Sequence, residues 1–437
     1  MQEHPHRRAL IDELHARPFA EIAAPCDVVF LACKHPQNAV GRDRAAERSL
    51  LADRLVAEGL DEKRLGNNHF LGPVGDDAQG DLLKWEQHSE FTSLALFRSA
   101  VAPEAFAFDD IRETLENWAE GLTAPVLVKV SLRVEHSPDD PDAIGEQLER
   151  WFNAKSLVAA RILDGTAVLA GDFQLDAHGH MRFALFVPPS CSPARVGQLV
   201  QSVLEIETYR AMSMLGLDRA RKLAKALTDF DQRLEDIILA MAKADSDPES
   251  LLFDLLNISS TLEEQAALMT FRFGATEAYN AIVHDRIELL REQRFEGLQT
   301  FHEFMMRRFD PAIRTVSSTQ DRLNSQLNRT TRTAELLRTQ VDVSRSAQSQ
   351  TLLTSMDRRN AVQLRLQRTV EGLSVIAISY YAVNLLAGFL FPMAQVFDFT
   401  KAQVTAALVL PVVILVALMI RRVRLGEGKD GDGNGDD

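Results

Sequence analysis

The longest uninterrupted apolar stretches of the chain lie near its C-terminus. Residues 370–391 (VEGLSVIAISYYAVNLLAGFLF) carry a charge only at Glu371, and residues 402–420 (AQVTAALVLPVVILVALMI) carry none. A helix of about 20 apolar residues is long enough to cross the hydrocarbon core of a bilayer, which is roughly 30 Å thick. Because only the short segment PMAQVFDFTK separates the two stretches, the pattern predicts a transmembrane hairpin over residues 370–420.

Arginines flank both outer ends of the predicted hairpin, whereas the loop between the two stretches has only Asp398 and Lys401 as charged residues. The positive-inside rule places such arginine-rich flanks in the cytoplasm. We therefore expect a multi-pass protein of the inner (plasma) membrane, with both termini in the cytoplasm. The side chains expected to contact anionic lipid headgroups are Arg358, Arg359, Arg365, Arg368, Arg421, Arg422 and Arg424.

The first part of the chain, residues 1–191, has the pattern of a mixed α+β domain. Helical periodicity appears at residues 42–58, 109–118 and 142–152. Strand-like runs that end at turn residues cover 27–32, 82–85, 91–97, 126–134, 157–163, 167–173 and 182–187. Because neighbouring runs lack regular helical crossovers, the pattern favours a cytoplasmic α+β domain over a doubly wound sheet.

From Ser192 onward the pattern is helical. Ser192-Pro193 is typical of a helix start, Gly216 is a candidate break, and Thr261–Glu264 resembles a capping box, so residues 192–309 form a predicted helical region. Asp310-Pro311 should begin a long helix that forms a coiled-coil stalk over 310–369, enters the first span and ends at Pro392. Its expected seam is Ile313, Val316, Gln320, Leu323, Leu327, Thr330, Ala334, Leu337, Val341 and Ser344.

Charge and cysteine content narrow the classes of partner. The formal net charge of −14 argues against nucleic-acid binding. The cysteines lack the spacing of a zinc site, so reduced thiols are expected in the cytoplasm and no cofactor is predicted. Residues 421–437 read as a disordered acidic tail. The expected partners are the membrane, anionic lipid headgroups and further copies of the same chain.

One polar cluster suggests a metal site. Glu86, His88 and Glu90 alternate, and on one continuous strand all three side chains would share a face. Such a face can bind a divalent metal or act in acid–base catalysis, although the same pattern fits a solvated sheet face or a hairpin bend. His15 lies in a second candidate polar segment, HPHRRALIDELHARPF, for which an amphipathic docking helix is the alternative.

The polar residues of the first predicted span include Glu371 at its cytoplasmic end and Asn384 within it. Polar groups inside a membrane usually face protein or a water path. They are therefore candidates for an ion path, with helix–helix contact as the alternative. A single two-helix hairpin cannot enclose a pore, so conduction would require an oligomer.

Several segments together resemble a known bacterial family: ELHARPF, KWEQHSEF, RILD and GDF, LEIETYRAMSMLG and RTVEGLSVIAISYY. This family consists of uncharacterised membrane-anchored proteins that share a domain of unknown function. The resemblance covers nearly the whole chain and implies membrane anchoring, but it supplies no catalytic residues. The layout is also similar to CorA-type divalent-cation channels, yet Phe389–Met393 stands where that family has its Gly-Met-Asn signature.

The leading hypothesis from the sequence is a non-enzymatic, oligomeric, membrane-anchored scaffold or sensor that faces the cytoplasm. An oligomeric ion channel or transporter of CorA-like layout is the second hypothesis. A metal-dependent cytoplasmic domain that uses Glu86, His88 and Glu90 is the third.

Overall fold

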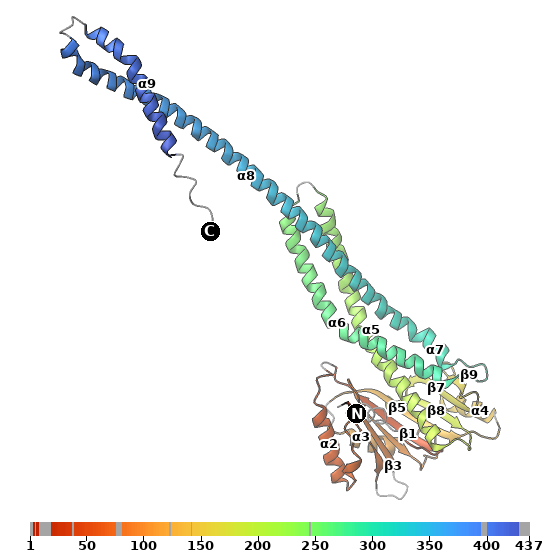
Figure 1. The fold of residues 1–437 in the computed structure, drawn as a ribbon. Helices are drawn as coiled ribbons and strands as arrows, with labels where there is room; N and C mark the ends of the chain where they lie inside the picture. Colours follow the sequence, from red (N-terminus) through yellow and green to blue (C-terminus); the bar gives the residue numbers. More distant parts are fainter. Residues whose placement is uncertain are drawn as a thin grey trace. The chain divides into compact units, whose positions relative to one another are not determined.

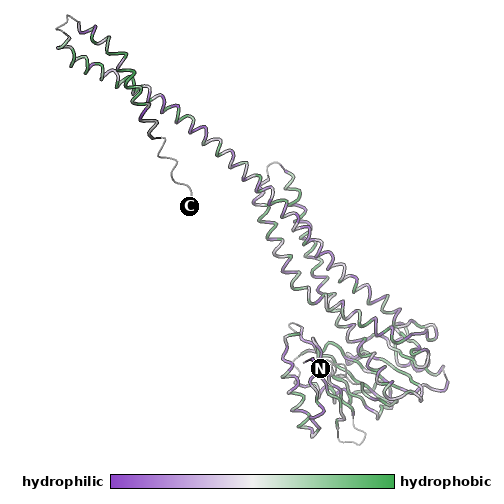
Figure 2. Tube along the Cα trace, in the orientation of Figure 1, coloured by the Kyte–Doolittle hydropathy of each residue, from purple (hydrophilic) through white to green (hydrophobic). Residues whose placement is uncertain are grey.

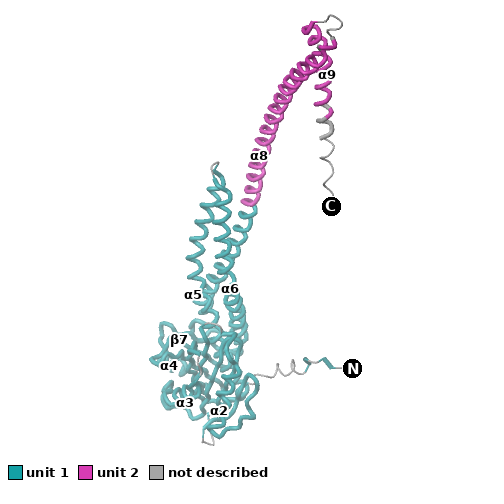
Figure 3. The backbone as a smooth tube through the Cα atoms, turned by 90° about the vertical axis from the view of Figure 1, so that its left-hand side faces the viewer, with its two compact units in different colours: residues 1–335 teal, residues 336–437 magenta. Residues whose placement is uncertain are grey.

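The computed structural model describes residues 3–4, 6–7, 19–36, 39–75, 81–121, 124–140, 142–243, 246–394 and 400–427. His15 and Asp398, two residues named above, lie outside these ranges. The chain divides into two compact units, residues 1–335 and residues 336–437 (Figure 3). The first unit holds a β-sheet and most of the helices, and the second holds the later part of one long helix and the whole of the last helix.

Within the described residues, the sheet of the first unit has nine strands. They are β1 (Cys26–Cys33), β2 (His69–Val74), β3 (Asp81–Gln87), β4 (Thr92–Arg98), β5 (Val126–His136), β6 (Val158–Ile162), β7 (Ala167–Leu175), β8 (Met181–Val187) and β9 (Gln293–Arg294). Their order is β2-β3-β4-β1-β5-β8-β7-β6-β9. Figure 1 shows the sheet together with the helices of the first unit. The β5–β8 pair is parallel and the others are antiparallel. The predicted α+β class is therefore confirmed.

All seven predicted strands are present, and the two edge strands β2 and β9 are additional. The sequence analysis missed β2 because Gly72-Pro73 has the composition of a turn. An edge strand tolerates proline, since one side of it makes no ladder hydrogen bonds. Strand β9 has only two residues, too few to show any period.

Helices cover both faces of the sheet. On one face lie α2 (Arg44–Ala57), α3 (Asp109–Ala119) and α4 (Asp142–Trp151), with the 3-10 turn η1 (Glu62–Arg64) nearby; on the other lie α5 (Pro193–Met241), α6 (Pro248–Leu290) and α7 (Phe301–Arg308). Strand β1 shows why both faces are buried. Its Val29 packs with Leu51 of α2, whereas Val28 packs in the core that contains Val200 of α5.

The two long helices of the first unit begin at clear caps. The Ser192 side chain accepts a hydrogen bond from the Arg195 backbone N–H, and Pro193 follows, as predicted. Helix α6 begins at Pro248 under an Asp247 cap, so the capping box expected at Thr261–Glu264 is wrong. Thr261 lies inside the helix, where its hydroxyl donates to the Asn257 carbonyl at 2.9 Å. This local bond satisfies a threonine that the sequence analysis took for a cap.

The last long helix, α8 (Asp310–Ala394), begins at the predicted residue but continues two residues beyond Pro392, where it was expected to end. In the first unit it lies beside α5 (Figure 3). Arg322 of α8 donates to Asp231 of α5 at 2.7 Å, and the Gln326 side chain donates to the Leu227 carbonyl at 2.7 Å.

The seam expected on α8 is partly present. Val316, Leu323, Thr330 and Leu337 are buried as predicted, whereas Gln320, Leu327 and Ala334 are only half-buried. Thr319, Gln326 and Thr333, each one residue earlier, take the interior positions instead. The repeat of three and four residues holds, but polar side chains occupy several of the buried positions. A coiled coil between chains stays a prediction.

Among the residues that the structure describes, two helices are long and apolar enough to cross a membrane, namely the part Asp310–Leu390 of α8 and the part Lys401–Ile420 of α9 (Lys401–Glu427). Figure 2 shows hydrophobic residues gathered along the end of α8 and along α9. Within the second unit, Val383 packs against Val412 and Val416. Helix α9 extends to Glu427, into the segment predicted as a tail, and residues 428–437 lie outside the described ranges.

Candidate functional site

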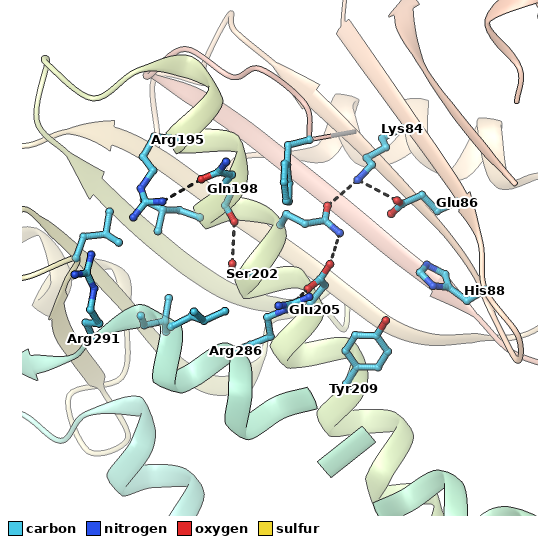
Figure 4. A pocket seen from close by; sticks show the side chains of 16 residues that line it. Lys84, Glu86, His88, Arg195, Gln198, Ser202, Glu205, Tyr209, Arg286 and Arg291 are labelled. Carbon is cyan, nitrogen blue, oxygen red and sulfur yellow. Dashed lines mark hydrogen bonds and ion pairs between the residues drawn. The ribbon is translucent and has the colours of Figure 1, made fainter. Parts of the chain in front are cut away.

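A cavity of about 500 Å³ lies where strand β3 meets helices α5 and α6 (Figure 4). Its polar wall comes from all three elements. The side chains that form this wall are Lys84 and Glu86 from β3, Gln198, Gln201 and Glu205 from α5, and Arg286 from α6. We call it the β3–α5 cavity.

A continuous chain of polar contacts crosses the wall of the β3–α5 cavity (Figure 4). Lys84 Nζ lies 3.2 Å from Glu86 Oε1 and donates to Gln201 Oε1 at 2.9 Å. Gln201 Nε2 in turn donates to Glu205 Oε1 at 2.8 Å, and Arg286 Nε donates to Glu205 Oε2 at 2.5 Å. This chain links the sheet to α5 and α5 to α6, so that any molecule entering the cavity meets groups of alternating charge.

Ordinary periodicity places these side chains. Lys84 and Glu86 are two residues apart on β3 and therefore point to the same face of the sheet. Gln201 and Glu205 are four residues apart on α5 and therefore share one face of the helix. The sequence analysis missed Gln201, Glu205 and Arg286, although the polar positions 198, 201, 202 and 205 on one face of a helix were a usable signal.

Lys84 and Glu86 are buried, each about 4% exposed. A buried ion pair stays favourable only if its remaining polar atoms are also satisfied. Glu86 Oε1 accepts no hydrogen bond among the described residues. Its contact with Lys84 Nζ at 3.2 Å is an ion pair without the geometry of a hydrogen bond. The floor of the cavity therefore retains an acceptor with unused capacity.

The rim of the β3–α5 cavity is basic and the rest of its wall is apolar. Arg195 is exposed and donates to Gln198 at 3.0 Å, while Arg291 pairs with Asp164 at 2.6 Å. The apolar side chains that line the cavity include Phe19, Leu163, Leu199 and Leu289. Ligand sites typically combine such an apolar wall with a few fixed polar groups.

The structure places the predicted metal residues around a hairpin bend. Strand β3 ends at Gln87, and the His88 N–H donates to the Phe91 carbonyl at 2.9 Å across the turn. Glu86 and His88 both line the β3–α5 cavity (Figure 4). His88 also stacks on Phe91, whereas Glu90 bonds to Tyr279 of α6. In the described part of the chain, no three His, Cys, Asp or Glu side chains gather as a metal site.

The predicted residues of the first span bond within their own helix. The Gln367 side chain donates to the Glu371 carboxylate at 3.2 Å, and the Asn384 side chain donates to the Tyr380 carbonyl at 3.1 Å. Asn384 also lines a groove of about 320 Å³ between α8 and α9.

The arginines expected at lipid headgroups lie on the same two helices. The exposed ones are Arg422 of α9 and, on α8, Arg358, Arg359, Arg365 and Arg368. Arg421 and Arg424 belong to α9, but their side chains lie outside the described part of the structure.

Comparison with known proteins places the chain in a family without assigning an activity. Residues 2–426 match the family described as "Protein of unknown function (DUF3422)". No curated protein and no solved structure matches the chain. The family match covers almost the whole sequence, in agreement with the first resemblance noted above, and no CorA-type family matches. The chain therefore belongs to the DUF3422 family of proteins of unknown function.

Proposed function

We propose that this protein is a membrane-anchored sensor whose first unit faces the cytoplasm and binds a small amphiphilic anion in the β3–α5 cavity. The observation that carries the proposal is the composition of the cavity wall, which combines a basic rim, an apolar side and a polar chain linking the sheet to α5 and α6. Its volume of about 500 Å³ lies within the range typical of small-molecule sites.

The nature of the ligand follows from the wall. Arg195 and Arg286 offer guanidinium groups, which bind carboxylates through paired N–H donors. Phe19, Leu163 and Leu289 offer apolar surface beside them. A carboxylate with a short hydrocarbon body, such as octanoate, matches both parts of the wall.

Helix α5 provides a route from the cavity to α8. Its Gln201 and Glu205 line the cavity, and its Asp231 accepts from Arg322 of α8. A ligand that takes the place of Gln201 at Lys84 removes a contact between the sheet and α5. The position of α5 against α8 in the first unit would then report whether the cavity is occupied.

Octanoate is the probe for this site. We expect calorimetry with the full-length protein in nanodiscs to show binding, and the Arg195→Gln variant to bind about tenfold more weakly through loss of a charge-assisted contact. Arg233→Gln, an exposed change elsewhere on α5, should bind like the wild type. Equal affinity in both variants, or no binding at all, contradicts the proposal.

The anchor rests on the exposure of apolar side chains in the second unit. Ile376, Leu385 and Phe389 on α8 are 69%, 76% and 77% exposed, as is 70% of Leu410 on α9. Apolar surface of this extent on adjacent helices marks a binding or membrane-facing surface. We propose that a bilayer covers it and that the arginine-rich flanks stay in the cytoplasm.

Membrane topology can be tested with single-cysteine reporters. With both termini in the cytoplasm, Lys401→Cys lies near the outer loop and should react with a membrane-impermeant maleimide in intact cells. Arg422→Cys lies in a cytoplasmic flank and should react only after permeabilisation. The opposite labelling pattern would reverse the orientation.

We also propose that the chain self-associates through α8. All residues of the segment 345–370 are exposed, and Leu352, Leu366 and Val370 recur on one helical face. Light scattering of the detergent-solubilised protein should give an oligomer whose mass falls for Leu366→Glu. Leu364→Glu, on the opposite face of the helix, is the matched control. A strictly monomeric wild type excludes self-association.

An oligomeric channel is the second candidate, favoured by the groove between α8 and α9. Ser379, Asn384 and Thr405 give this otherwise apolar groove a polar side, and Ser379 Oγ is buried without a hydrogen bond among the described residues. The channel hypothesis predicts cation or anion flux in proteoliposomes that drops for Glu371→Ala. Absence of flux for common ions would remove it.

A further inference from the structure

A second pocket, of about 380 Å³, lies in the first unit where the end of β1 and the start of β5 meet α5 and α6. The Lys34 backbone N–H donates to the Pro125 carbonyl at 2.9 Å, which holds Lys34 beside the start of β5. Three basic side chains line this pocket, Lys34 after β1, Arg219 of α5 and Arg272 of α6. We call it the Arg272 pocket.

Two of these basic side chains are buried. Lys34 is 7% exposed and Arg272 is 3% exposed, while Arg219 is half-buried. Their acidic partner is Glu90, itself 2% exposed, which accepts from Arg272 and lies 3.6 Å from Lys34 Nζ. The cluster of Lys34, Arg219, Arg272 and Glu90 therefore carries an excess of positive charge.

The other acidic residue at the pocket does not offset this excess. Asp218 is exposed and pairs with Lys222 at 2.6 Å. Nor does the Tyr279 hydroxyl help, because it donates to Glu90 at 2.9 Å and so competes with the cations for the same carboxylate. Burial of unbalanced charge is unfavourable unless a counter-charge arrives.

Several N–H groups in the Arg272 pocket have unused capacity. Nη1 of Arg272 is buried and has no hydrogen-bond partner among the residues that the structure describes, whereas Nη2 donates to Glu90. Lys34 Nζ donates to the His35 carbonyl at 3.0 Å and lies 3.6 Å from Glu90, so these two contacts leave one of its three N–H bonds for a ligand. The pKa of Lys34 is lowered, chiefly by burial and next by the positive charge of the nearby Arg272. Both effects disfavour the charged form of a lysine.

We propose that the Arg272 pocket binds a doubly charged oxyanion, the phosphate group of a small molecule, between Arg272, Lys34 and Arg219. Guanidinium groups match the geometry of phosphate oxygens, and a lysine adds a point charge. The remaining wall, formed in part by Val126, Leu127 and Leu215, is apolar and accommodates the organic part of a phosphate monoester.

The Arg272 pocket is separate from the β3–α5 cavity, and a pair of stacked tyrosines lies between the two. Tyr209 lines the β3–α5 cavity and stacks on Tyr279 at 5.4 Å between ring centroids. Tyr279 in turn bonds to Glu90 of the Arg272 cluster. The two pockets therefore share a layer of side chains while each has its own cations.

The test is calorimetry on the full-length protein in detergent at pH 7.5, where phosphate is mainly a dianion. Inorganic phosphate and phenyl phosphate are the two probes, and sodium chloride of equal ionic strength is the blank. We expect both probes to bind, with phenyl phosphate the tighter. If inorganic phosphate binds and phenyl phosphate does not, the proposed place for an organic part is wrong.

Three variants locate the binding. Arg219→Gln should weaken phosphate binding about tenfold by removing one charge-assisted contact, and Arg219 has no hydrogen bond or ion pair in the described structure that its loss would break. Arg221→Gln removes the same charge from an exposed position two residues along α5 and should not change the affinity. Arg286→Gln removes a cation of the β3–α5 cavity and should also leave the affinity for phosphate unchanged.

The opposite results would overturn the proposal. These are no binding of either phosphate to the wild type, equal loss in Arg219→Gln and Arg221→Gln, or loss confined to Arg286→Gln. The last result would place the phosphate in the β3–α5 cavity. Failure of octanoate to bind, with phosphate binding intact, would refute only the sensor proposal.

Discussion

Gly216 of α5 lies directly against Thr276 of α6. A Cβ atom added at Gly216 would lie 2.3 Å from Thr276 Oγ1 and 3.2 Å from its Cβ. The Thr276 hydroxyl donates to the Ser213 carbonyl at 3.2 Å, which holds the threonine in place against α5. The glycine expected to break the helix is therefore a point of close approach between the two helices, and α5 continues through it.

Substitution at this contact should destabilise the first unit. Gly216→Ala forces the helices apart or the threonine from its rotamer, at a cost of about 1–3 kcal/mol in the free energy of unfolding. Gly274→Ala on α6 is the control, because an added Cβ there meets no atom within 4 Å and alanine favours a helix by about 1 kcal/mol. Denaturant unfolding of both variants measures the difference. Equal stability would place the helices further apart.

The buried pair of Lys84 and Glu86 should be sensitive to loss of either partner. Lys84→Met leaves the Glu86 carboxylate buried without its cation, which we expect to cost about 3–5 kcal/mol. The double variant Lys84→Met/Glu86→Leu removes both charges and should recover most of this loss. The free energy of unfolding can be followed by tryptophan fluorescence, to which the buried Trp85 of the same strand contributes. A double variant as unstable as the single one contradicts this account.

His180 should make stability depend on pH. Its side chain is 1% exposed, and burial together with the neighbouring Arg112 lowers its pKa from 6.5 to about 4. Between these values the unfolded chain binds a proton that the folded chain does not. Stability contributed by the neutral imidazole is therefore complete above pH 6.5 and decreases as the pH falls towards 4, by up to about 3 kcal/mol.

The measurement is the free energy of unfolding at pH 7 and pH 5 for the wild type and His180→Gln. Arg112, Asp176 and Lys129 also act on His180 and are present in both proteins. We expect the wild type to lose more stability than the variant on acidification. An equal loss in both would assign the pH dependence to other groups.

The cysteines should differ sharply in reactivity. Burial raises the pKa of the Cys26 thiol to about 12 and that of Cys33 to about 11, so neither forms the nucleophilic thiolate near neutral pH. Cys191 is only half-buried. A disulfide reagent at pH 8 should therefore modify only Cys191 in the native protein and all the cysteines after denaturation. If the reagent modified the native Cys191→Ser variant, Cys26 or Cys33 would be accessible, which contradicts this prediction.

The predicted metal cluster shows where a sequence pattern stops being informative. Glu86 and Glu90 were grouped because they alternate with His88 near one strand. The strand ends at Gln87, and the bend sends the two carboxylates to different cations, Lys84 and Arg272. Whether a strand continues or turns is decided by its neighbours in the sheet. The cation that Glu90 meets, Arg272, lies far away in the sequence, so no local pattern could indicate the pair.

The sequence by itself determined the local elements, because periodicity and caps act over a few residues. The apolar runs of α8 and α9, the start of α5 at Ser192 and the strands of the sheet other than β2 and β9 follow from such short-range patterns. Only the tertiary structure decided which side chains share a site. Lys84, Gln201 and Arg286 meet because the sheet and two helices pack together, and so do Lys34, Arg219 and Arg272. Each of these contacts depends on chain segments too far apart for any local pattern to join them.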